Sequence, residues 1–138
     1  MAVKQFTIST HTSGRGLIEI THLLAEKLSQ YEIETGLLNI FLQHTSASLV
    51  ITENADPTVL VDLETIFQRL APDADPEYLH DYEGDDDMAA HVRSVLTSTE
   101  LSIPISGGRL ALGTWQGVFI WEHRFRPHSR SIIVTILS

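Results

Sequence analysis

The chain has no cysteine among its 138 residues, which excludes disulfide bonds and thiolate metal ligands. Any metal site would therefore be built from histidine and carboxylate side chains. The N-terminal segment lacks the apolar core of a secretory signal, and no run approaches the roughly 18 apolar residues that a membrane span needs. We therefore expect a soluble, cytoplasmic protein with no membrane partner.

Basic charge is also scarce. Nine Lys and Arg residues face 18 Asp and Glu residues, which gives a formal net charge of -9 and a pI near 5.1. Binding to a phosphate backbone requires a basic surface, so we do not expect nucleic acid as a partner. Residues 71–87 hold eight of the acids and no Lys or Arg, so the rest of the chain is nearly neutral.

The hydrophobic content of 43% is enough for one substantial core in a chain of this length. No internal repeat and no low-complexity linker divides the sequence. We therefore expect a single domain that spans residues 1–138.

Hydrophobic periodicity predicts three helices and several strands. The helices are expected at residues 18–31, at 57–70 after an Asp56 N-cap, and from Asp86 or Asp87 to about Thr97. The apolar stripe by which the second helix is expected to pack against the core consists of Val59 or Leu60, Leu63, Ile66, Phe67 and Leu70. Strands are expected at 3–9, 37–42, 49–52, 101–105, 110–112, 118–121 and 131–137. These elements predict an α+β fold: a compact antiparallel β-sheet or sandwich with about three helices.

Two connections can be predicted from the same pattern. The runs 37–42 and 49–52 are expected to be neighbouring strands, joined through a corner at 44–46. Residues 106–109 read Ser-Gly-Gly-Arg, which is suited to a tight hairpin turn.

Polar side chains gather in three segments, at residues 43–56, 80–91 and 113–124. The strongest site hypothesis takes one histidine from a strand end, one from a loop and one from a helix: His44, His80 and His91. Three neutral imidazoles can hold a divalent metal and leave a position open for water or substrate. Asp87 lies four residues before His91, where a carboxylate on the same helical face can orient the imidazole. The alternative is that these histidines are solvated and that the acids favour a helix N-terminus.

Other residues could bind substrate. Thr45 and Ser46 can donate hydrogen bonds to an anion or cap a turn. Trp115 can line a pocket or belong to the core, and Gln116 beside it would need partners if buried. A basic patch that could hold phosphate, or instead lie solvated or pair with Glu122, consists of Arg124, Arg126 and Arg130.

Four stretches together resemble the YjbQ family, also called secondary thiamine-phosphate synthases. They are residues 44–48 (His-Thr-Ser-Ala-Ser), 54–57 (Asn-Ala-Asp-Pro), the helix start at 87–91 and residues 113–117 (Gly-Thr-Trp-Gln-Gly). The resemblance covers essentially the whole chain. It implies a compact α+β fold in a homotrimer, with the polar motifs gathered in a pocket near a subunit boundary.

The resemblance also implies an activity. In this family's weak thiamine-phosphate synthase reaction, the thiazole phosphate nitrogen attacks hydroxymethylpyrimidine diphosphate and pyrophosphate leaves. The implied metal or catalytic imidazoles are His44, His80 and His91, with Asp87 as their orienter. The implied substrate-binding residues are Thr45, Ser46, Asn54, Trp115 and Gln116, and the basic patch adds Arg126. The sequence at 84–88 (Gly-Asp-Asp-Asp-Met) departs from the Gly-Asp-Gly-Asn-Gly-like stretch of many members.

We therefore expect a small-molecule enzyme that uses a divalent metal, Zn²⁺ or Mg²⁺, and no organic cofactor. A metal-dependent hydrolase with the same pocket is the nearest alternative. A non-catalytic protein that binds a metal or a phosphorylated ligand is the alternative from another class.

Overall fold

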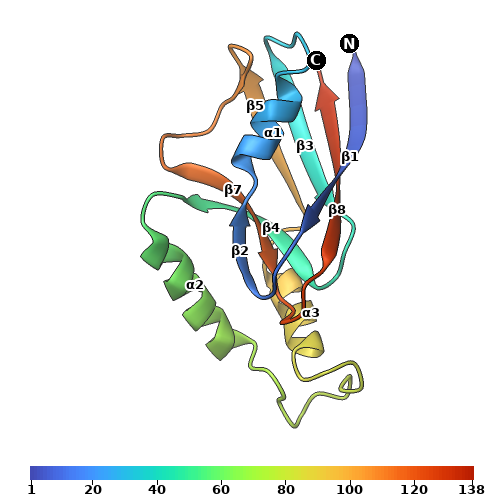
Figure 1. The fold of residues 1–138 in the computed structure, drawn as a ribbon, viewed down its shortest axis with the longest axis vertical. Helices are drawn as coiled ribbons and strands as arrows, with labels where there is room; N and C mark the ends of the chain where they lie inside the picture. The colour runs from blue at the N-terminus through green and yellow to red at the C-terminus, as the bar shows by residue number, and fades with distance from the viewer.

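The computed structural model describes residues 1–138 and contains two antiparallel sheets and three helices (Figure 1). The first sheet has the order β1 (Val3–His11), β8 (Ser129–Leu137), β3 (Gly36–Leu42), β5 (Glu100–Ser106) and β6 (Arg109–Leu110). The second has the order β2 (Gly16–Glu19), β7 (Gln116–Glu122) and β4 (Ala47–Glu53). The helices are α1 (Thr21–Leu28), α2 (Pro57–Leu70) and α3 (Asp87–Leu96). The predicted fold class is confirmed.

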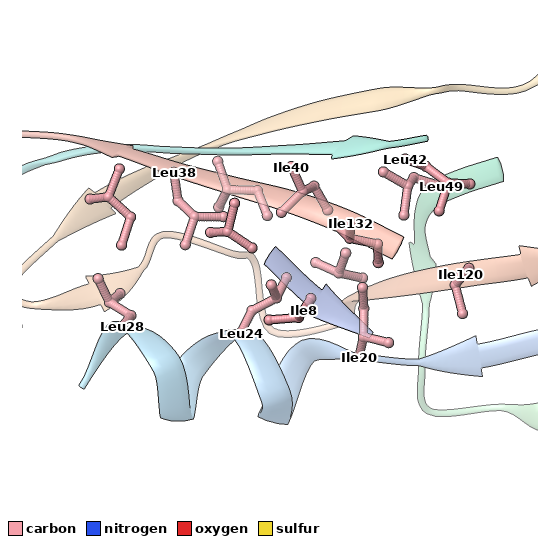
Figure 2. Close-up of a cluster of buried hydrophobic side chains, with 14 of the residues drawn as sticks. Ile8, Ile20, Leu24, Leu28, Leu38, Ile40, Leu42, Leu49, Ile120 and Ile132 are labelled. Carbon is pink, nitrogen blue, oxygen red and sulfur yellow. The ribbon is translucent and has the colours of Figure 1, made fainter. Parts of the chain in front are cut away.

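The hydrophobic core lies between the five-stranded sheet and α1, and it continues onto the three-stranded sheet (Figure 2). Alternate residues of β8 point into this core: Ile132, Val134 and Ile136. Leu24 and Leu28 of α1 lie one turn apart and are buried against the same core. The apolar residues that alternate along the strands and those that recur once per helical turn therefore belong to one core.

Strand β7 is the centre of the three-stranded sheet and is buried on both faces. Val118 and Ile120 belong to the core. On the other face, Trp121 contacts Phe67 of α2 edge-on, with their ring centroids 4.7 Å apart. Helix α2 therefore covers part of this sheet.

None of the three helices has the length and apolar character needed to cross a membrane. Helix α2 starts as predicted, because the Asp56 side chain accepts a hydrogen bond from the Thr58 amide and Pro57 occupies the first turn. The predicted buried stripe is wrong in extent. No α2 residue is fully buried, and Ile66 and Leu70 are exposed, because the helix contacts the sheet along only part of its surface.

The first helix is shorter than predicted. It begins at Thr21 because Leu17 and Ile18 instead pair with β7 as part of β2, a strand that the sequence pattern did not reveal. The prediction that 37–42 and 49–52 are paired neighbours is also wrong. The chain crosses at the 44–46 corner from the first sheet into the second, so β3 pairs with β5 and β8 while β4 pairs with β7.

The hairpin between β5 and β6 has the predicted tight turn. Gly107 and Gly108 have φ angles of +60° and +72°, which glycine adopts without a steric penalty. The following strand ends at Leu110, so the prediction of a strand to residue 112 is too long.

Candidate functional site

Four potential metal ligands meet at the start of α3. His80 and Glu83 come from the loop before the helix, and Asp87 and His91 lie one turn apart on the helix itself. One ligand atom from each residue lies within 4.8 Å of the others. The 3.2 Å distance between His91 Nε2 and Asp87 Oδ2 follows from the i, i+4 spacing that places both on one helical face.

Asp87 is the centre of this group. Its Oδ2 lies 2.7 Å from His80 Nε2 and 3.2 Å from His91 Nε2, while its Oδ1 accepts a 2.7 Å hydrogen bond from Arg124 Nη1. Glu83 Oε2 completes the group at 3.2 Å from His80 Nε2. The Asp87 side chain is almost fully buried, so it is held at a fixed position between the two imidazoles.

The hydrogen-bond partner of the His91 ring shows which of its nitrogens carries the proton. His91 Nδ1 lies 3.0 Å from the Thr45 carbonyl oxygen, which only accepts hydrogen bonds, so Nδ1 carries the proton. In the neutral ring, the Nε2 lone pair then faces Asp87. A carboxylate and an imidazole lone pair at 3.2 Å need a shared proton or a cation between them.

The charges within the group reinforce one another. The hydrogen bond with Asp87 raises the pKa of His80. Burial opposes ionisation of Asp87, but its hydrogen bond with His80 and the charges of His91 and Arg124 outweigh burial and leave its pKa lowered. Asp87 is therefore a carboxylate at neutral pH.

Arg124 joins this group to the turn between β7 and β8. Its Nη1 donates to Asp87, its Nε donates to Asp86 Oδ2 at 3.1 Å, and its Nη2 donates to the Glu83 carbonyl at 2.9 Å. Asp86 also accepts a 2.7 Å hydrogen bond from the Phe125 amide. Thus one guanidinium contacts three of the residues that shape the group.

A pocket of about 540 Å³ opens beside His91. Its lining comes from the end of β3, the 43–45 corner and α3 with the loop after it: Phe41, Leu42, Gln43, His44, Thr45, His91, Ser94, Val95, Thr97 and Thr99. His91 therefore belongs both to the pocket and to the four-ligand group.

His44 lies in the pocket but outside the four-ligand group. Its Nε2 accepts a 2.8 Å hydrogen bond from the Ser131 amide, so this nitrogen is unprotonated and already engaged. Burial, followed by the charge of Arg130, lowers the pKa of His44. The neutral ring is left with Nδ1–H as a hydrogen-bond donor.

Ser46, two residues after His44, contacts a buried ion pair. Arg130 Nη2 donates to Ser46 Oγ at 3.0 Å and also binds the Glu122 carboxylate. Thr12 donates a 2.6 Å hydrogen bond to Glu122, which is fully buried. Ser46 therefore supports the corner from the interior, whereas Thr45 next to it is exposed.

The other expected substrate-binding residues lie elsewhere in the subunit. Gln116 pairs in register with Glu53 at the far end of the β4–β7 ladder. Seven residues at about 3.3 Å each separate that end from the 44–46 corner by roughly 23 Å. Asn54 is at the same end, where its side chain donates to Glu19. Trp115 is 63% exposed and not a core residue.

Gln116 and Arg126 were also expected to bind substrate, and both side chains are exposed. Gln116 is exposed, and its side-chain oxygen accepts a 2.8 Å hydrogen bond from the Gly113 amide, so it stabilises a local turn. Arg126 is exposed on the loop before β8. The structure thus brings His80, Asp87 and His91 together. Within one chain, it does not place Asn54, Trp115 or Gln116 beside them.

Sequence reasoning missed two members of the site. Glu83 lies three residues after His80, a spacing that could have marked it as a possible ligand. Arg124 was expected to hold phosphate, lie solvated or pair with Glu122, because nothing in the local sequence links it to a helix start 37 residues earlier.

A serine and histidine pair also escaped notice. Ser48 Oγ and His123 Nε2 lie 2.8 Å apart, which is within reach for proton transfer. Both residues are fully buried, and burial, followed by the charge of Arg93, lowers the pKa of His123 to about 3. The pair has no access to a substrate and stabilises the interior.

Comparison with known proteins agrees with this architecture. Residues 4–138 match the family model described as UPF0047 protein YjbQ-like. The UPF0047 protein sll1880 of Synechocystis is 51% identical over 125 residues, which cover 91% of this chain and 85% of the relative. The UPF0047 protein YjbQ of Salmonella typhimurium is 47% identical over 133 residues, which cover 96% of each chain.

Solved structures show the same fold. A conserved hypothetical protein of Thermus thermophilus superposes with a TM-score of 0.85 at 36% identity, over 96% of this chain and 99% of that one. An uncharacterized conserved protein of Clostridium acetobutylicum gives a TM-score of 0.84 at 30% identity, over 97% and 99% of the two chains. The family match over almost the whole length and the identity to its members show that this chain belongs to the UPF0047 YjbQ-like family.

Proposed function

We propose that this protein is a metal-dependent enzyme for small phosphorylated molecules. The observation that carries the proposal is the meeting of two imidazoles and two carboxylates beside a pocket, with His91 common to both. A divalent cation at this point would bind His80, His91 and Asp87, with Glu83 as the fourth ligand. The metal would supply positive charge for a phosphate group placed at the pocket wall.

The spacing of the donor atoms fits a small divalent ion. Tetrahedral ligands at about 2.05 Å from Zn²⁺ lie roughly 3.3 Å apart. The distances of 3.2 Å from Asp87 to His91 and from His80 to Glu83 are close to this value. The 2.7 Å between His80 and Asp87 is a direct hydrogen bond, which a bound metal would have to replace. Two nitrogen ligands favour Zn²⁺ over Mg²⁺, which prefers oxygen.

The reaction that we assign is the joining of hydroxymethylpyrimidine diphosphate to thiazole phosphate, as a weak or secondary activity. Negative charge builds up on the leaving pyrophosphate and needs a cation nearby. The pocket contains no Lys or Arg, so the charge must come from the metal centre or from outside the pocket. Neutral His44, with its free Nδ1–H, is suited to donate a hydrogen bond to the substrate.

A homotrimer would explain the dispersed motif residues. Asn54, Trp115 and Gln116 lie at the end of the sheet opposite to the pocket, and Trp115 is largely exposed. If these residues serve the same site, they must reach it from another copy of the chain. We therefore include a subunit boundary in the proposed site.

The first test is the metal content of tag-free protein, measured by elemental analysis in the wild type and in single alanine variants. We expect about one Zn²⁺ per chain, which is lost in His80→Ala and His91→Ala. His44→Ala should keep the metal if its ring only contacts the substrate, and should lose it if three histidines form the ligand set. Absence of metal after zinc is supplied would refute the proposal.

The activity is tested on the zinc-loaded protein by pyrophosphate release. Release that requires both substrates supports the synthase. Release of phosphate or pyrophosphate from one substrate alone identifies a hydrolase instead. Tight binding of phosphorylated ligands without turnover would identify a non-catalytic binding protein.

Arg124 should be a positioning residue for this centre. Arg124→Lys retains the charge but cannot contact Asp86, Asp87 and the Glu83 carbonyl at once. Loss of such an outer contact typically lowers metal affinity about 10- to 100-fold, and we expect a decrease in that range by chelator competition. The visible spectrum of the Co²⁺-loaded variant should also change, because the ligand geometry changes.

Arg126→Lys is the matched control, because Arg126 lies two residues away and is exposed. It should leave both the affinity and the spectrum unchanged. If Arg124→Lys lowers only the melting temperature and not the metal affinity, its role is structural.

A further inference from the structure

A buried arginine on α3 has an incomplete set of hydrogen-bond partners. Arg93 is fully buried, and its Nη1 donates to the Glu64 carboxylate of α2. Its Nε and Nη2 are also buried, and neither has a partner. Nε and Nη2 together form the edge of a guanidinium that can bind both oxygens of one carboxylate in parallel. The Arg93 edge with this capacity is therefore unused.

Glu64 is bound by two donors that do not belong to its own helix. Its Oε1 accepts from Arg93 Nη1 on α3, and its Oε2 accepts a 2.8 Å hydrogen bond from Trp121 Nε1 on β7. Arg93 and Trp121 thus form an anion-binding site on the body of the protein, and α2 supplies the anion. Glu64 therefore occupies the position that the head group of an anionic ligand would take.

The Glu64 carboxylate can leave this position without unfolding of α2. No residue of α2 is fully buried, and the Glu64 side chain is 21% exposed, whereas that of Arg93 is 0% exposed. Rotation of the Glu64 side chain would bring its carboxylate into water. The same rotation would leave the buried Arg93 charge without a partner, which is costly unless another anion replaces Glu64.

A groove of about 380 Å³ leads from the surface to Glu64, where α2 runs beside β2 (Figure 1). Glu64 is the only charged residue of its lining. Apolar surface in the groove comes from Leu17, Leu60 and Val61. The groove therefore combines apolar walls with an inner end that is cationic once Glu64 has turned away.

We propose that this groove binds an aliphatic monocarboxylate, whose head group displaces Glu64 from Arg93 and Trp121. The ligand can engage two nitrogens of Arg93 at once, which Glu64 does not do. Its hydrocarbon chain would lie against the apolar walls. Because Glu64 is tethered beside the site, it is an internal competitor that keeps the affinity of the wild type low. The inference rests on no part of the proposed metal centre or its reaction.

The test is an NMR titration of the full-length protein with hexanoate, in EDTA so that no metal contributes. The chain has two tryptophans, and Trp115 is 63% exposed, so its indole N–H signal is an internal control for that of buried Trp121. In the wild type we expect the Trp121 signal to shift and to saturate at millimolar hexanoate, while the Trp115 signal stays in place. Hexanamide, which has the same chain without the charge, should bind at least about 10-fold more weakly. Butyrate should bind about 3- to 10-fold more weakly than hexanoate, because two methylenes are missing.

Glu64→Gln removes the internal competitor and leaves Arg93 in need of an anion. It should bind hexanoate at least about 10-fold more tightly than the wild type, and hexanoate should raise its melting temperature more. Asp62→Asn is the matched control, because Asp62 is an exposed acid on the same helix, and its affinity for hexanoate should equal that of the wild type.

Three results would each overturn the inference: a Trp121 signal that does not move with hexanoate in the wild type, equal binding of hexanamide, or wild-type affinity in Glu64→Gln. If Glu64→Gln does not fold, the comparison of hexanoate with hexanamide on the wild type decides. Hexanoate binding by a protein that takes up no zinc would refute only the metal proposal.

Discussion

Asp87→Asn is expected to lower the Zn²⁺ affinity by more than about 100-fold, the upper end of the loss seen when an outer partner of a metal ligand is removed. The reason is that Asp87 combines two functions. Its Oδ2 faces both imidazoles, and its Oδ1 is held by Arg124. An amide has the same shape but provides no negative charge between two nitrogen ligands. The affinity is measured by competition with a chelator of known strength.

The matched control is Asp85→Asn, which removes an exposed carboxylate two residues away. It should bind Zn²⁺ as the wild type does. The melting temperatures of both variants are compared in EDTA, so that a folding defect is separated from loss of the metal. Wild-type affinity in Asp87→Asn would show that the carboxylate is not a ligand.

Glu122→Gln is expected to destabilise the fold by about 3–5 kcal/mol, the range observed when one partner of a buried ion pair is removed. Glu122 is fully buried and binds Arg130, Thr12 and the Arg124 amide. The amide leaves the Arg130 charge in the interior without an opposite charge. Urea unfolding at pH 7 measures the loss, and Glu32→Gln, which changes an exposed acid, should alter the free energy of unfolding by less than about 0.5 kcal/mol.

The same pair makes the stability dependent on pH. Burial opposes ionisation of Glu122, but its hydrogen bonds with Arg130 and Thr12 outweigh burial and hold its pKa below the usual value of 4.5. A depressed folded-state pKa stabilises the protein above pH 4.5, and this contribution is lost as the pH falls through the folded-state value. The difference between wild type and Glu122→Gln should therefore shrink on acidification, and an undiminished difference at low pH would contradict the assignment.

Much of the architecture could be predicted because burial imposes a regular period. Ile132, Val134 and Ile136 alternate along β8, and Asp56 with Pro57 marks the start of α2. The exceptions are segments whose environment depends on distant parts of the chain. Residues 16–19 became a strand because β7 offers an edge, and α2 leaves Ile66 exposed because only part of it is covered.

In the candidate site, too, local contacts could be predicted from the sequence and contacts between distant segments could not. The contact of Asp87 with His91 could be predicted from helical spacing alone. The positions of His80 and Arg124 could not, since they depend on the path of an acidic loop and on a turn between two strands. The separation of Gln116 from His44 followed only from the register of β4 with β7.

The first and last strands lie side by side, and this has a consequence for synthesis of the chain. Strand β8 follows every other strand of the two sheets in chain order, yet it lies between β1 and β3 and pairs with both (Figure 1). Neither neighbour has its partner on that side until residues 129–137 have left the ribosome. Pairing between such distant segments gives a high contact order and slow folding. While the chain is still growing, β1 has no strand partner at all, so its unpaired backbone is open to pairing with other chains until β8 arrives.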